Sequence, residues 1–250
     1  RSNGAVVGRP GAVERRFRWL KAPLQVALGC LTAWLADLVL TPSRATAAEV
    51  GRDYQIEGIE VLPNVTGGLP VEPAGPSGEA PGYFLFVGRL RIRKGVEVLL
   101  EALTRIDPDL GPRLLIVGDG EHGRYLRSLA AHLELGERVR FVGRRSAAEV
   151  RSLLADARAL VVPSIYEGMP LVVLEAMESE TPVIASAVSG IPEVVVDGET
   201  GWLVPPEDGE SLSAALTEAL TDDAEAARRG VAGANRVERL YRPTAAAAIW

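Results

Sequence analysis

Apolar residues follow a repeating pattern along the chain from Tyr83 onward. Short apolar runs alternate with longer stretches in which apolar residues recur at helical spacing. The short runs predict buried strands, and the longer stretches predict amphipathic helices. The predicted strands are Tyr83–Val87, Leu114–Val117, Val139–Val142, Leu160–Val162, Val183–Ala185 and Trp202–Val204.

The stretches between these runs predict the helices of the same domain. They are Val96–Ile106, Arg124–Leu133, Ala147–Ala157, the residues after Pro170, a short turn near Glu193, Gly209–Leu220 and Ala224–Leu240. Strands and helices that alternate at this pitch are typical of a parallel sheet covered by helices on both faces. We therefore expect an α/β fold over residues 83–240, with the start of a C-terminal tail at 241–250.

The residues before Tyr83 show a different pattern. Leu24–Leu40 is the most hydrophobic run, and a membrane span needs about 20 mostly apolar residues, more than this run supplies. We expect a buried helix that leads into a strand at Leu38–Leu40. Ser43 predicts the N-cap of a helix through Val50, and Ile59–Leu62 predicts a further strand.

The stretch Thr66–Gly82 is rich in Gly and Pro and has no periodicity, which predicts a linker. The expected organisation is therefore the end of an N-terminal domain at 1–65, a linker at 66–82, and a C-terminal domain at 83–240.

Composition narrows the class of protein. The chain has 250 residues, 47% of them hydrophobic, and a net charge of −6, so we expect no nucleic-acid partner. The single cysteine, Cys30, excludes an internal disulfide and fits a reducing, cytoplasmic setting. Basic residues alternate with Phe17 and Trp19 in the stretch 9–21. This stretch is consistent with a solvated helix face or with peripheral contact at the inner face of a membrane.

Two stretches carry candidate chemistry. In Ser164–Pro182, seven residues separate Glu167 from Glu175, and Pro170 suits the first turn of a helix. Glu167 would then lie in the loop at the carboxyl edge of the sheet, where ligands bind and where free helix N–H groups favour an anion.

The second stretch, Gly88–Gly95, follows the first strand of the domain and lies at the same edge. Arg89 can form two hydrogen bonds to phosphate oxygens, and Lys94 adds a point charge. The two glycines would let the backbone approach a ligand closely.

Together, these stretches resemble the Glu–seven–Glu and G-R-L…K-G signatures of family 4 of the retaining glycosyltransferases, which have the GT-B fold. The resemblance implies a Rossmann-like domain plus the C-terminal part of a second one. It implies that Arg89 and Lys94 bind the donor diphosphate, Glu167 touches the donor sugar, and Glu175 holds the ribose hydroxyls. The remaining donor-binding residues that it implies are Gly88, Gly168, Met169, Pro170 and Leu171, with backbone groups of Val142 and Gly143 at the nucleobase.

The implied activity is the retaining transfer of a hexosyl group from a nucleotide sugar to a glycan, lipid or small molecule. The resemblance also implies that a donor phosphate oxygen takes the acceptor proton. We expect an enzyme of bacterial glycan biosynthesis that needs no metal or other cofactor. We also expect a fragment whose acceptor-binding half is missing, so that it binds a nucleoside diphosphate but does not transfer sugar.

Three alternatives stay open. Gly118–Gly123 fits G-x-G-x-x-G, and Arg144 and Arg145 at the end of the next strand would suit the extra phosphate of NADP, as in an oxidoreductase domain. A sugar-nucleotide epimerase of the same fold and a non-catalytic nucleotide-binding module are the others.

Asp107-Pro108-Asp109 precedes a strand and predicts a turn.

Four residues are expected to have no role at the site, and two others depart from the family pattern. We expect His122 and His132 to be solvated, and likewise Arg91 and Arg93. The family often has Gly at the positions of Glu180 and Ser189, and we expect Glu180 to weaken the end of its helix.

Overall fold

The computed structural model describes residues 30–32, 34–67 and 78–247. The chain divides into two compact units, Arg1–Val61 and Leu62–Trp250, so the division precedes the expected boundary at residue 65. The basic stretch 9–21 and most of the expected linker lie outside the described residues. Within the described ranges, no helix is long and apolar enough to cross a bilayer.

The first unit contains a small parallel sheet and one complete helix. Strand β1 (Val39–Thr41) pairs with β2 (Ile59–Val61), and helix α2 (Arg44–Tyr54) connects them. The Ser43 hydroxyl accepts the Thr46 N–H at 3.0 Å, which confirms the predicted N-cap. The helix continues about one turn past the predicted end at Val50.

The expectation of a buried helix before β1 is wrong in the part that the structure describes. Cys30–Thr32 and Trp34 are helical, but the Trp34 side chain is 78% exposed and Leu35 is 67% exposed. The sheet of this unit has only the two strands β1 and β2 among the described residues, and a two-stranded sheet offers little apolar surface against which a second helix could pack.

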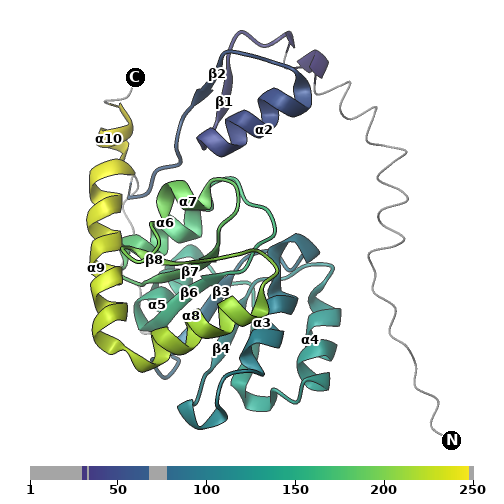
Figure 1. Cartoon of the computed structure of the whole chain (residues 1–250), viewed down its shortest axis with the longest axis vertical. Coiled ribbons are helices and arrows are strands. Elements are labelled where there is room, and N and C mark those ends of the chain that lie inside the picture. Colours follow the sequence, from purple (N-terminus) through teal and green to yellow (C-terminus); the bar gives the residue numbers. More distant parts are fainter. Residues whose placement is uncertain (1–29, 33, 68–77, 248–250) are drawn as a thin grey trace, which may run out of the picture. The chain divides into compact units, whose positions relative to one another are not determined.

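The second unit is built on a six-stranded parallel sheet in the order β5-β4-β3-β6-β7-β8 (Figure 1). The strands are β3 (Tyr83–Val87), β4 (Leu114–Val117), β5 (Val139–Gly143), β6 (Ala157–Val162), β7 (Val183–Ser186) and β8 (Gly201–Val204). All six predicted strands are present, and β6 begins three residues earlier than predicted.

Helices cover both faces of this sheet (Figure 1). They are α3 (Val96–Leu103), α4 (Gly123–His132), α5 (Ala147–Asp156), α6 (Leu171–Glu178), α7 (Ile191–Val194), α8 (Gly209–Thr221) and α9 (Asp223–Leu240). The short helix α10 (Pro243–Ala247) follows α9 and lies beyond the sheet (Figure 1). Ser146 and Glu149 form a capping box that starts α5 at the predicted residue. The predicted helices are confirmed with small shifts at their ends.

Alternate residues of each strand enter two separate cores. Phe84 and Phe86 of β3 face α3, α4 and α8, whereas Tyr83 and Leu85 face α5, α6 and α7. Helix α9 contributes Ala226 to the first core and Val237 to the second. Because both faces are covered, the strands read as continuous apolar runs, which is why the sequence predicted them well.

The strand order reverses next to β3. The chain leaves β3 for β4 and β5 on one side, and then returns to β6 on the other side of β3. The loops that follow β3 and β6 are therefore neighbours at the carboxyl edge of the sheet. In open α/β sheets, this reversal point is where ligands bind.

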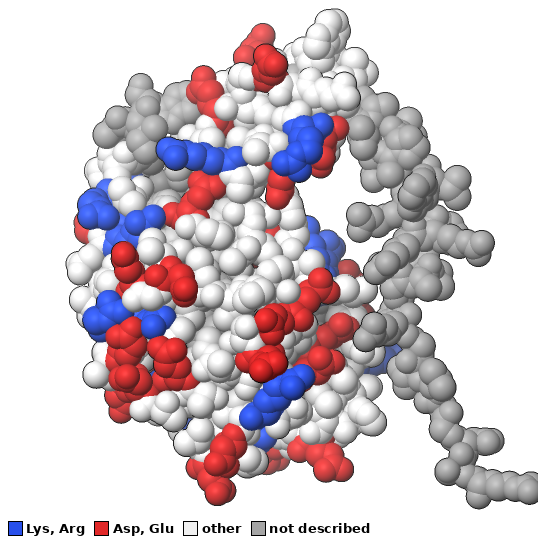
Figure 2. All heavy atoms as spheres, in the orientation of Figure 1, with Lys and Arg blue, Asp and Glu red and all other residues white. Residues whose placement is uncertain are grey.

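Basic side chains are scattered among acidic ones on the face of the molecule shown in Figure 2. A protein that binds nucleic acid gathers its basic side chains into a patch or stripe instead. The described residues on this face form no such patch, and the absence of a nucleic-acid partner stays a prediction.

Two non-glycine residues adopt left-handed backbone conformations where the family often has glycine. Glu180, which follows the last turn of α6, has φ of 56°, and Ser189 has φ of 43°. A side chain with a Cβ atom is strained in this region. The predicted weakness at the end of α6 therefore has a structural cause.

We expect Glu180→Gly to increase the free energy of unfolding. Removing the Cβ relieves about 1–2 kcal/mol of strain, and the greater freedom of glycine in the unfolded chain costs about 0.4–1 kcal/mol, so the net gain lies between about 0 and 1.6 kcal/mol, with a midpoint of about 0.8 kcal/mol. Urea denaturation measures it. Glu199 is an exposed glutamate outside the left-handed region, so Glu199→Gly is the matched control and should give no gain. Equal destabilisation by both changes would contradict the strained conformation.

Candidate functional site

The loops after β3 and β6 are joined through their backbones. The Ile165 N–H donates to the Arg93 carbonyl at 2.9 Å. Gly95 has φ of 65°, and a Cβ at this position would lie 1.8 Å from the Pro163 carbonyl oxygen. Gly95 is thus required for packing against the end of β6, and not for the close approach to a ligand that the sequence suggested. Only glycine fits here.

An ion pair connects the same two loops. Lys94, at the end of a short 3-10 turn (η1, Ile92–Lys94), pairs through Nζ with Oε1 of Glu167, and the two side chains are 18% and 12% exposed. The buried Ser164 hydroxyl donates to the same oxygen at 2.9 Å. No described residue donates a hydrogen bond to Oε2 of Glu167. The carboxylate is therefore held in one orientation with one oxygen available to a ligand.

The sequence singled out Lys94 and Glu167 for separate roles and did not predict their contact. It also missed Ser164, because a serine three residues before a glutamate carries no signal of its own. Arg91 was expected to be solvated, but its Nε lies 3.2 Å from Oε1 of Glu121.

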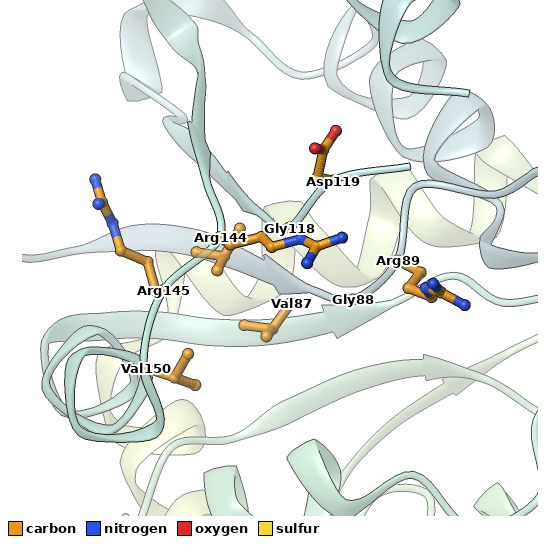
Figure 3. A pocket seen from close by; sticks show the side chains of 9 residues that line it. Val87, Gly88, Arg89, Gly118, Asp119, Arg144, Arg145 and Val150 are labelled. Atoms are coloured by element: carbon orange, nitrogen blue, oxygen red, sulfur yellow. The ribbon is translucent and has the colours of Figure 1, made fainter. Parts of the chain in front are cut away.

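A cavity of about 300 Å³ opens at the ends of β3, β4 and β5. Its lining consists of Val87, Gly88, Arg89, Val117, Gly118, Asp119, Arg144, Arg145 and Val150. Figure 3 shows that Arg144 extends across the cavity toward Gly118, whereas Arg145 points away on the other side. Arg89 and Arg144 are exposed, and their side chains make no hydrogen bond or ion pair with any described residue. Their guanidinium groups are free to bind an anion.

The glycines of the G-x-G-x-x-G stretch are explained by packing. A Cβ on Gly118 would lie 1.9 Å from the Gly88 carbonyl oxygen, and one on Gly120 would lie 2.3 Å from the Leu90 carbonyl oxygen. The stretch also follows β4, the second strand of its domain, and not the first strand as in a dinucleotide-binding fold. The geometry therefore gives no support to the oxidoreductase alternative.

The expectation that His122 is solvated is wrong. Its side chain is buried at the start of α4, with Nε2 2.5 Å from Oε1 of Glu97, and it stacks on Tyr125 at 4.7 Å. Packing of α3 against α4 covers this histidine, which the local sequence does not reveal. His132 is exposed, as predicted.

The loop that leads into α6 contains four of the predicted donor-binding residues. Pro170 is the N-cap of α6, with extended backbone, and not a residue of its first turn as predicted. Met169 is only 5% exposed and packs in the core, so its side chain is not available to a ligand. Gly168 and Pro170 are partly exposed and Leu171 is exposed. Of the four, only the Met169 side chain is closed to a ligand, and donor binding by Gly168, Pro170 and Leu171 stays a prediction.

Glu175 lies on α6 and is partly buried. Burial raises the pKa of Glu175, the positive charge of Arg151 lowers it, and the negative charge of Glu178 raises it further. No hydrogen-bond donor among the described residues reaches its carboxylate. A partly buried carboxylate without donors is suited to accept hydrogen bonds from a bound hydroxyl group.

Val142 and Gly143 end β5. The Gly143 carbonyl accepts the Gly118 N–H at 2.7 Å, and Val142 packs partly against the core. Their recognition of a nucleobase stays a prediction.

The described residues contain no cluster of three or more His, Cys, Asp or Glu side chains that could hold a metal ion. In the Asp107-Pro108-Asp109 turn, Asp107 accepts the Asp109 N–H at 2.9 Å, so this carboxylate caps the turn as predicted.

Comparisons with known proteins agree with this architecture. The family model of the glycosyl transferases group 1 matches residues 72–236. The glycogen synthase of Mycobacterium tuberculosis is 32% identical over 232 residues, which cover 89% of this chain and 56% of that protein. The chain thus spans about half the length of this curated relative.

Solved structures show the same fold. The sucrose-phosphate synthase from Thermosynechococcus elongatus superposes with a TM-score of 0.79 at 33% identity, over 91% of this chain and 60% of that chain. The Anabaena protein HepE, solved in complex with UDP and glucose, superposes with a TM-score of 0.78 at 21% identity, over 90% of this chain and 65% of that chain. The predicted α/β fold of GT-B type is confirmed. The chain belongs to the glycosyl transferases group 1 family.

Proposed function

We propose that this chain binds a nucleotide-sugar donor and that the whole protein transfers the hexosyl group, with retention, to a glycan, lipid or small-molecule acceptor. The observation that carries the proposal is that Arg89, Lys94 and Glu167 lie on the two neighbouring loops after β3 and β6, where the strand order reverses, with Lys94 paired to Glu167. The binding of UDP and glucose by a protein of the same fold supports a nucleotide sugar as the ligand.

The donor diphosphate would lie between Arg89 and the start of α6. Arg89 lines the cavity, and the first N–H groups of α6 favour an anion at the same edge of the sheet. Negative charge develops on the diphosphate as it leaves the sugar, and these fixed positive groups would stabilise it. They perform the role that a divalent cation has in other phosphate sites, so we propose that binding needs no metal.

Lys94 and Glu167 would act as a unit. Lys94 has three N–H donors, so it can keep its bond to Glu167 and still donate to a phosphate oxygen. Oε2 of Glu167 would accept a hydroxyl group of the hexosyl ring. The ion pair thereby fixes the distance between the diphosphate and the sugar, which is the form of positioning that accelerates transfer.

The nucleoside would occupy the other end of the site. Glu175 would accept hydrogen bonds from the ribose hydroxyls, and the cavity bordered by Arg144 would lie beside the base. A thermal-shift panel of nucleoside diphosphates and their hexoses, with NADPH as a comparison, tests the assignment. A preference for NADPH would overturn it.

We expect Arg89→Lys and Lys94→Ala each to weaken binding of the nucleoside diphosphate that the panel selects. A hydrogen bond to a charged group contributes about 1.5–3 kcal/mol, so affinity should fall about ten- to hundredfold. Isothermal titration calorimetry measures it. Arg93 is an exposed arginine in the same loop that does not line the cavity, so Arg93→Lys is the matched control and should bind normally. Unchanged affinity in both test variants would show that Arg89 and Lys94 do not bind the diphosphate.

We expect Glu167→Gln to weaken binding of the nucleotide sugar more than binding of the free diphosphate. The amide can no longer pair with Lys94 or accept as strongly from a sugar hydroxyl, and Lys94 gains freedom to bind phosphate. The ratio of the two dissociation constants, measured in one titration series, should therefore change by about tenfold. Equal losses for both ligands would place Glu167 away from the sugar.

We expect Glu175→Gln to stabilise the chain at neutral pH while weakening nucleotide binding. Burial raises the pKa of Glu175 above its unfolded-state value, so its ionised form destabilises the native state at neutral pH. This destabilisation disappears as the pH falls through the raised pKa, because the native state then takes up the proton. The melting temperature of the variant should exceed that of the wild type at pH 7, and the difference should shrink on acidification.

A suitable control lies one turn further along α6. Glu178 accepts a hydrogen bond from Thr66 and pairs with Arg242, so Glu178→Gln should lower the melting temperature. If Glu175→Gln also lowers it at pH 7, the carboxylate has a partner that offsets its burial.

A further inference from the structure

The segment that follows β2 is bound to residues far along the sequence. The Asn64 side-chain amide donates to the Met169 carbonyl at 2.6 Å. The Thr66 hydroxyl donates to Oε2 of Glu178 at 2.7 Å, and the Thr66 N–H donates to the Tyr241 carbonyl at 3.0 Å. Residues 64–66 are therefore fixed against the second unit, to which they belong.

The attachment at Thr66 is rigid. Oε1 of Glu178 pairs with Arg242, which also binds Glu238 at 2.7 Å. A Cβ on Gly67 would lie 1.5 Å from a terminal nitrogen of Arg242, so the segment packs directly on this network. Asn64, two residues earlier, thus projects its amide from a fixed backbone.

The Met169 carbonyl belongs to the peptide bond that joins the Glu167 loop to α6. The Met169 side chain is held in the core, and Pro170 caps the helix. Because Pro170 has no N–H, this peptide unit offers only its carbonyl for a hydrogen bond, and Asn64 supplies the donor. The orientation of the Met169–Pro170 peptide unit decides where the first N–H groups of α6 point and where Gly168 and Glu167 lie.

We propose that Asn64 is a positioning residue for the donor site, which fixes the Met169–Pro170 peptide and so aims the Glu167 loop and the start of α6 at the bound diphosphate and sugar. The proposal rests on the proposed function for its ligand, but the fixing of the loop does not. Asparagine suits the position because it is short and carries an N–H donor. Aspartate has the same shape without a donor, and leucine has a similar size without polar groups.

The test compares Asn64→Asp and Asn64→Leu with Thr66→Val in the full chain. Hydrogen exchange of the backbone amides of Gly168, Met169, Leu171 and Val172 reports the mobility of the loop without ligand. Calorimetry gives affinities for the best-binding nucleotide sugar among the UDP-, GDP-, ADP- and dTDP-hexoses and for the monophosphate of the same nucleoside. In both Asn64 variants we expect exchange to rise and affinity for the nucleotide sugar to fall about tenfold, with less than about a twofold change for the monophosphate.

The control separates positioning from general stability. Thr66→Val should lower the melting temperature and leave the ratio of the two affinities unchanged, because Thr66 binds the far end of α6. The proposal would be overturned if the Asn64 variants left both the hydrogen exchange of the loop and the ratio of the two affinities unchanged. It would also be overturned if Thr66→Val changed this ratio by the same factor. If the wild-type chain binds no nucleotide sugar but the Asn64 variants still loosen the loop, the proposed function fails and the positioning role of Asn64 stands.

Discussion

The ion pair between Lys94 and Glu167 connects the two loops on which the candidate site depends. Both side chains are largely buried, and taking two charges out of water is costly unless each has a close partner and further hydrogen bonds. Ser164 supplies such a bond to Glu167. Removing either charge would leave the other partly buried and uncompensated. The pair is therefore a constraint on any ligand, which has to bind around it and use the donors and acceptors that the pair leaves free.

The site is also rigid because backbone packs directly on backbone around it. Gly95 lies against the Pro163 carbonyl, and Gly118 lies against the Gly88 carbonyl. Such contacts leave no room for a Cβ, and they hold the ends of β3, β4 and β6 at fixed separations. What can still move are the exposed side chains of Arg89 and Arg144. Binding should thus rearrange side chains more than loops.

The strands could be predicted from the sequence because burial on both faces leaves continuous apolar runs. Motifs singled out Arg89, Lys94, Glu167 and Glu175 as candidates for the site, and their roles stay predictions. Sequence reasoning could not find contacts that depend on strand order. Lys94 and Glu167 meet only because β6 lies beside β3, and no local pattern encodes that neighbour. Burial of His122 by α3, and of the Met169 side chain by the core, is likewise a property of the tertiary fold. The prediction of a buried helix from the apolar run before β1 was wrong for a related reason. The hydrophobicity of a segment does not show which other element would cover it.

Helix α6 joins these features into one element. Its first residues follow the Glu167 loop, Glu175 lies midway, and Glu178 near its end is bound to Thr66 and Arg242. Helix α9 lies across its far end so closely that a Cβ on Gly230 would be 2.0 Å from the Glu180 carbonyl oxygen. Structural contacts therefore fix one end of a short rigid helix, and the candidate site lies at the other end. The strained backbone at Glu180 and the partly buried carboxylate of Glu175 are both expected to reduce stability, and the packing around α6 offsets them because it determines where the two ends of the helix lie.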